Sequence, residues 1–148
     1  MTVTLKKPTP ACVPVHLTDR ASLAQHAAAL SPAERQWLAT LGFTGAPDTH
    51  ALLPDSEGGL QAVWAGVRAA GHPFALSALP RALPAGRYCL GSAGLQAEPE
   101  AAALSWALGG YAFTRYKPAR RAPAELVLPA SDAARRGLLV AEAIAHTR

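Results

Sequence analysis

At 148 residues, half of them hydrophobic and only 16% charged, the chain has the length and composition of one globular domain, which excludes intrinsic disorder. No apolar run approaches the roughly 20 residues that span a bilayer, and the first residues lack the apolar stretch of a signal peptide. Two cysteines are too few for a disulfide framework, so we expect a cytoplasmic protein without membrane contact.

The first forty residues predict one strand and two helices. Residues 11–17 form a short apolar run with β-branched side chains, which is typical of a strand, and an Ala-rich helix is expected to end near Leu30. The next helix has a sharper signal, because Ser31 can cap it and Glu34 completes a capping box. Gly42 can end this helix.

The middle of the chain predicts a hairpin, a short helix and a further strand. Residues 49–55 and 59–67 are strand-like runs on either side of the turn sequence "SEGG". A short helix is expected over residues 74–79, and residues 87–92 read as a strand.

A long helix is expected from Glu98 to about Tyr116, a brief strand over residues 124–129, and a final helix from Ser131 onward. Strands that alternate with helices predict an α/β domain with helices layered on a sheet, and the hairpin predicts that the sheet is mixed. We expect residues 1–120 to form this domain and residues 121–148 to form a connector strand and a linker helix.

The long helix is apolar around its whole circumference, which is typical of a buried helix. Gly109 and Gly110 each cost about 1 kcal/mol of helix propensity relative to alanine, so we expect another element to approach the helix closely there. The large side chains are therefore interpreted as structural core and not as a base-stacking surface: Trp106, Leu108, Tyr111, Phe113 and Tyr116.

A cluster of basic residues follows this helix and is the densest in the chain: Arg115, Lys117, Arg120 and Arg121. It is a candidate nucleic-acid contact, although a solvated loop after a helix is the simpler explanation. With a net charge of only +4, the composition does not favour DNA as a partner.

No catalytic or metal-binding motif is found. The five histidines lie in no ligand spacing, and the acidic residues at the turn and at the helix starts have structural explanations. Cys12, His16 and Cys89 could form a zinc site only if the fold gathered them, which we do not expect. We predict no catalytic residue, metal ligand or cofactor in this chain.

The last helix carries apolar residues around most of its circumference, so it is expected to need contact on more than one side. Together with the lack of a catalytic or metal-binding motif, this apolar helix predicts that the chain is part of a longer polypeptide. It also predicts that the chain associates with itself through this helix.

Three segments, "LPAGRYCLG", "ALSWALGGYAFTRYK" and "ELVLPASDAARRGLLVAEAIAHTR", resemble the leucyl aminopeptidase (cytosol aminopeptidase) family. The resemblance identifies the chain as the non-catalytic N-terminal domain, an α/β/α layered fold somewhat like a macro domain, followed by the helix that leads to the catalytic domain. All the catalytic and metal-binding residues of the family lie in that catalytic domain, so none is assigned here.

The resemblance further implies a parent metallopeptidase of the cytoplasm, a hydrolase that uses two divalent metal ions, zinc or manganese, to remove N-terminal residues from peptides. Its partners would be its own catalytic domain, further copies of itself in a hexamer, and peptide substrate in the complete enzyme only. The domain would serve assembly and access to the active sites. Binding of a nucleotide-like ligand such as ADP-ribose follows from fold analogy alone.

Overall fold

The computed structural model describes residues 2–69, 71–116 and 124–146, with residues 112–116 described by their backbone only. Its centre is a six-stranded sheet with the order β1-β6-β5-β2-β4-β3. The strands are β1 (Val3–Leu5), β2 (Val13–Thr18), β3 (His50–Pro54), β4 (Leu60–Gly66), β5 (Arg87–Leu90) and β6 (Glu125–Leu128). Among the paired strands of the described residues, β3 and β4 run antiparallel and the other pairs are parallel, so the prediction of an α/β domain with a mixed sheet is confirmed.

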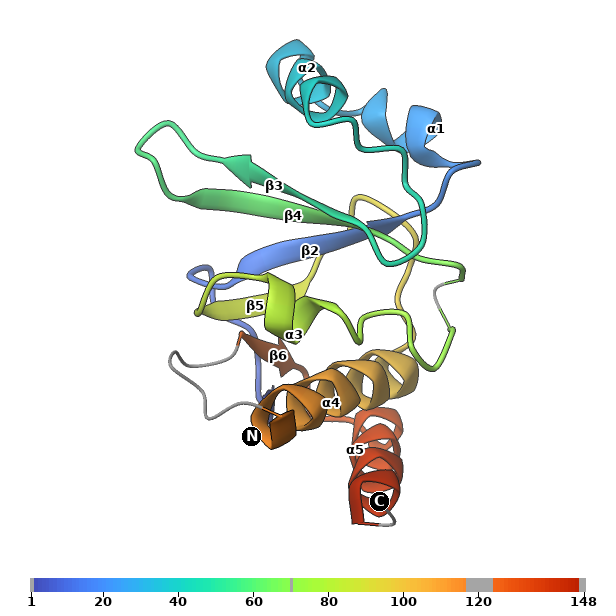
Figure 1. Cartoon of the computed structure of the whole chain (residues 1–148). Helices are drawn as coiled ribbons and strands as arrows, with labels where there is room; N and C mark the ends of the chain where they lie inside the picture. The colour runs from blue at the N-terminus through green and yellow to red at the C-terminus, as the bar shows by residue number, and fades with distance from the viewer. Residues whose placement is uncertain (1, 70, 117–123, 147–148) are drawn as a thin grey trace.

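Helices cover the sheet unevenly (Figure 1). They are α1 (Leu23–Ala27), α2 (Pro32–Thr40), α3 (Leu79–Ala82), α4 (Pro99–Tyr116) and α5 (Asp132–His146). Helices α1 and α2 lie beside the β3–β4 end, while α4 and α5 lie together at the opposite end of the sheet (Figure 1). Among the described residues, no helix combines the length and the apolar character that crossing a membrane requires.

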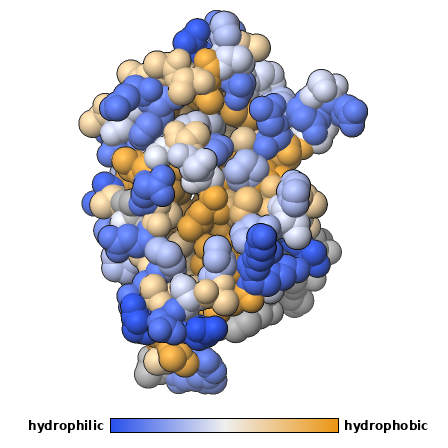
Figure 2. Space-filling view, turned by 180° about the vertical axis from the view of Figure 1, so that it is seen from behind, coloured by the Kyte–Doolittle hydropathy of each residue, from blue (hydrophilic) through white to orange (hydrophobic). Residues whose placement is uncertain are grey.

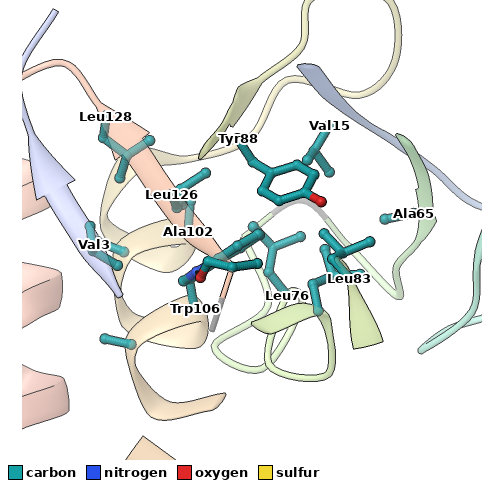
Figure 3. Close-up of a cluster of buried hydrophobic side chains, with 14 of the residues drawn as sticks. Val3, Val15, Ala65, Leu76, Leu83, Tyr88, Ala102, Trp106, Leu126 and Leu128 are labelled. Carbon is teal, nitrogen blue, oxygen red and sulfur yellow. The ribbon is translucent and has the colours of Figure 1, made fainter. Parts of the chain in front are cut away.

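The larger core lies between the sheet and helices α3 and α4. Trp106 of α4 is fully buried, and its ring centroid lies 6.1 Å from that of Tyr88 of β5. Figure 3 shows these two side chains among aliphatic residues from several strands, including Val15 and Leu126. A smaller cluster on the other face of the hairpin places Leu38 of α2 against the β3 and β4 side chains.

The two adjacent glycines of α4 are sites of close approach. Gly109 lies against the backbone carbonyl of Ser77, and Gly110 lies against the side chain of Thr2, so a Cβ at either position would overlap with these atoms. A similar close approach occurs where α5 crosses α4, because Gly137 lies against the carbonyl of Glu100. Glycine at these positions thus allows neighbouring segments of the chain to pack closely against the two helices.

The start of α2 follows its predicted capping signals. The Ser31 hydroxyl accepts the backbone N–H of Glu34 at 3.2 Å, and the Glu34 carboxylate accepts the backbone N–H of Ser31 at 3.4 Å. Beyond the helix, Gly42 adopts φ +72°, the left-handed conformation that suits a helix end. Local sequence chemistry is sufficient to specify both ends of this helix.

Two local predictions were wrong, and one strand was missed. The expected helix over residues 74–79 is a series of turns, and α3 begins only at Leu79, because Pro80 suits the first turn of a helix and not its interior. Helix α1 ends at Ala27, short of the expected end near Leu30. Strand β1 was not predicted, and it joins the sheet through parallel pairing with β6.

The final segment contributes to the body of the domain. Strand β6 lies between β1 and β5 in the sheet, and α5 follows it directly and packs along α4. An ion pair of 3.7 Å between Arg136 and Glu100 joins the two helices at their exposed margin.

Candidate functional site

The carboxyl ends of β5 and β6 border a cavity of about 340 Å³, in the place where open α/β sheets commonly bind ligands. Its lining comes from the ends of the two strands, the loop after β5, the starts of α4 and α5, and Pro8 in the connection between β1 and β2. Most of the lining is apolar, and the polar side chains in it are Ser92, Gln96 and Ser131.

The lining of this cavity does not favour an anionic ligand. Its lining contains no lysine, arginine or histidine, and the two helices that begin beside it carry Glu100 and Asp132 in their first turns. In the loop after β5, the backbone N–H groups of Gly91 and Leu95 donate to the carbonyls of Val15 and Leu17 of β2, each at 2.7 Å. Nucleotide binding therefore stays a prediction from fold analogy, without a charged group in the lining to support it.

A second cavity, of about 330 Å³, lies beyond the end of β4 and contains the charges that the first lacks. Asp48, Arg68 and His72 line it together with Phe74, whose side chain is largely exposed. Asp48 adopts φ +64°, a backbone conformation uncommon for residues other than glycine. Sequence reasoning did not identify these residues, because no motif spacing links position 48 to positions 68–74.

His16 of β2 is a structural histidine. Its ring lies against that of Trp64, with centroids 4.9 Å apart, and its Nδ1 accepts the backbone N–H of Ala93 at 3.2 Å. Gly91 packs directly on the imidazole, so this ring supports the loop after β5. Burial lowers the pKa of His16, and the nearby carboxylate of Glu34 opposes this effect in part.

The lowered pKa of His16 predicts a pH dependence of stability. Below about pH 6.5 the unfolded chain takes up a proton on this residue more readily than the folded chain does, so the free energy of unfolding falls as the pH falls. In His16→Asn, whose side-chain oxygen can still accept the Ala93 N–H, we expect a smaller loss of stability between about pH 7.5 and pH 5.5 than in the wild type.

Urea unfolding followed by circular dichroism at several pH values measures this difference. His50 stays in both proteins and also has a pKa lowered by burial, so part of the pH dependence remains in the variant. Equal slopes for the two proteins would show that His16 does not contribute.

The described residues contain no group of three histidine, cysteine or acidic side chains that could hold a metal ion. Burial and the nearby Cys12 thiol raise the pKa of Cys89, but the ring of His16 is engaged by Trp64 and Ala93. The fold therefore does not gather Cys12, His16 and Cys89 into the zinc site considered from the sequence.

Of the predicted core residues and the predicted basic cluster, the structure describes only some side chains. Trp106 is fully buried, and Leu108 and Tyr111 are partly buried against the main core. The side chains of Phe113, Arg115 and Tyr116 lie outside the described residues, as do Lys117, Arg120 and Arg121 entirely. The nucleic-acid contact stays a prediction.

Comparisons with known proteins agree on one family. The family model for the M17 aminopeptidase, N-terminal domain, matches residues 13–129. The crystal structure of cytosol aminopeptidase from Coxiella burnetii matches with a TM-score of 0.74 and 27% sequence identity, over 88% of this chain and 29% of that one. The search of curated proteins found no match. The chain spans less than a third of the matched enzyme, and it belongs to the family of M17 aminopeptidase N-terminal domains.

Proposed function

We propose that this chain is the non-catalytic N-terminal domain of a leucyl aminopeptidase and that it acts in assembly of the enzyme and in access to its active sites. The single observation that carries this proposal is the match of the M17 N-terminal domain family to residues 13–129. The complete enzyme would remove N-terminal residues from peptides in the cytoplasm, as a hexamer, with two zinc or manganese ions. Both ions would be held by the catalytic domain, as the resemblance to the leucyl aminopeptidase family implies.

Helix α5 supplies the surface for the proposed role. Ala134, Gly137 and Ala141 face α4 and are buried, whereas Leu139 and Val140 are 65% and 42% exposed. Exposed large aliphatic side chains on a helix that packs on only one side are typical of a surface that another protein part covers. Helix α5 would thus lead from this domain, whose sheet includes β6, toward the catalytic domain.

The distribution of hydrophobic surface supports a role in assembly. Figure 2 shows hydrophobic residues gathered near the centre of one face with hydrophilic residues around them, and further hydrophobic surface at the lower end, where Figure 1 places α5. An apolar centre with a polar rim is the usual composition of a protein interface.

The exposed face of α5 predicts that the 148-residue chain associates with itself. Replacing both Leu139 and Val140 by glutamate places charges on that face, and we expect the association to weaken at least tenfold, since a loss of about 1.4 kcal/mol already has this effect. Sedimentation velocity over a concentration series measures the change.

Leu41→Glu is the matched control, because Leu41 is 50% exposed and lies at the end of α2, far along the chain from α5. This variant is expected to associate like the wild type. A wild-type chain that stays monomeric at high concentration, or a control as strongly affected as the α5 variant, would contradict the proposed role of α5.

A further inference from the structure

The connection between β1 and β2 has a chemical feature that the proposed function does not use. Residues 6–12 carry the chain from an edge strand to a central strand, and they form no helix. This connection ends at Cys12, which directly precedes β2. Its described backbone hydrogen bonds are those from Lys6 to Leu128 and from Cys12 to Thr9, so few contacts of this kind hold it.

The second cysteine lies on the neighbouring strand. Strands β2 and β5 run parallel, and Cys89 of β5 is paired with Pro14 of β2, two residues after Cys12. Burial raises the pKa of Cys89, and the neighbouring Cys12 thiol raises it further, which indicates that the two side chains lie close together. Both cysteines are free in this structure. A cross-link at this point would attach the end of the connection to the central part of the sheet.

We propose that Cys12 and Cys89 form a redox modification site that closes to an intramolecular disulfide when a low-molecular-weight disulfide, such as glutathione disulfide, is the oxidant. The thiolate of one cysteine attacks a sulfur of the oxidant, forms a mixed disulfide and releases one thiolate. The second cysteine then attacks the protein sulfur of this mixed disulfide, the bond to the attached thiol breaks, and the protein disulfide forms. The two released thiolates take up the two protons, so the oxidant is reduced to two thiols.

The exposure of the two cysteines assigns their order in this reaction. Cys89 is partly exposed and meets the oxidant first, whereas Cys12 is 6% exposed and acts as the resolving thiol. Burial raises the pKa of Cys89, so little thiolate is present near neutral pH. We therefore expect the rate of oxidation to rise about tenfold per pH unit below that pKa, because the thiolate is the reactive form.

Mass spectrometry and thiol titration of the 148-residue chain test this proposal. After incubation with excess glutathione disulfide at about pH 8.5, the wild type should lose both titratable thiols under denaturing conditions, stay monomeric on a non-reducing gel, and yield one peptide pair joined through Cys12 and Cys89. Its midpoint of thermal unfolding should rise by roughly 5–10 °C over the reduced protein, since the closed loop is long.

Two single variants separate the roles of the cysteines. Cys12→Ala should accumulate a stable glutathione adduct on Cys89, whereas Cys89→Ala should react at less than a tenth of that rate because Cys12 is buried. Circular dichroism verifies that each variant is folded, and the wild-type peptide map decides the question if one is not. Two free thiols in the treated wild type, stable adducts on it, or a disulfide-linked dimer would each overturn the proposal.

Discussion

Replacing Trp106 by alanine is expected to lower the free energy of unfolding by about 3–5 kcal/mol, the range for removal of a fully buried large aromatic side chain. The indole fills the space between α4 and the sheet, beside the ring of Tyr88 (Figure 3). Its Nε1 donates to the carbonyl of Ala124 at 3.1 Å, so the substitution also leaves a buried acceptor without its donor. Urea unfolding followed by circular dichroism measures the loss.

Trp37→Ala is the matched control for this prediction. Trp37 is 42% exposed, and its Nε1 likewise donates to a backbone carbonyl, that of Leu52, at 2.9 Å. The two variants remove the same atoms and the same kind of hydrogen bond, so they differ mainly in burial. A loss at Trp106 no larger than that at Trp37 would show that α4 does not hold the core as described.

Gly109→Ala is expected to destabilise the protein by about 2 kcal/mol, although alanine favours a helix over glycine by about 1 kcal/mol. The added methyl group would occupy the position of the Ser77 carbonyl oxygen, so the turns over residues 73–78 must move away from α4. The clash involves backbone atoms, which cannot change rotamer, and its energetic cost therefore exceeds the gain in helix propensity.

Ala39→Gly measures the contribution of helix propensity alone. Ala39 is exposed on α2, and its replacement should cost about 1 kcal/mol through helix propensity alone. If Gly109→Ala raises the free energy of unfolding by the same amount, the close approach of the Ser77 backbone to α4 does not contribute to stability. Thermal unfolding of both variants beside the wild type gives the comparison.

Local chemistry accounts for the features that the sequence predicted well. Ser31 and Glu34 specify the start of α2 through hydrogen bonds between near neighbours, and the hairpin of β3 and β4 is set by a glycine turn between two apolar runs. The two glycines of α4 indicated a close approach without revealing its partners, Ser77 and Thr2.

Features that depend on distant contacts could not be read from the sequence. Strand β1 is only three residues long and gains its hydrogen bonds from β6, which lies more than a hundred residues away in the chain. The proximity of Cys12 to Cys89 arises from the parallel pairing of β2 with β5, and the cavity at Arg68 and His72 arises from loops that meet beyond β4. No residue spacing in the sequence records any of these arrangements.

We propose that these residues build a domain and that another part of the complete enzyme carries out peptide hydrolysis. Incubation of the purified 148-residue chain with leucine p-nitroanilide, in the presence of Mn²⁺ or Zn²⁺, tests it most directly. We expect no release of p-nitroaniline above that in buffer with the same metal. Release that scales with chain concentration, and that stays with the protein through successive purification steps, would contradict the account.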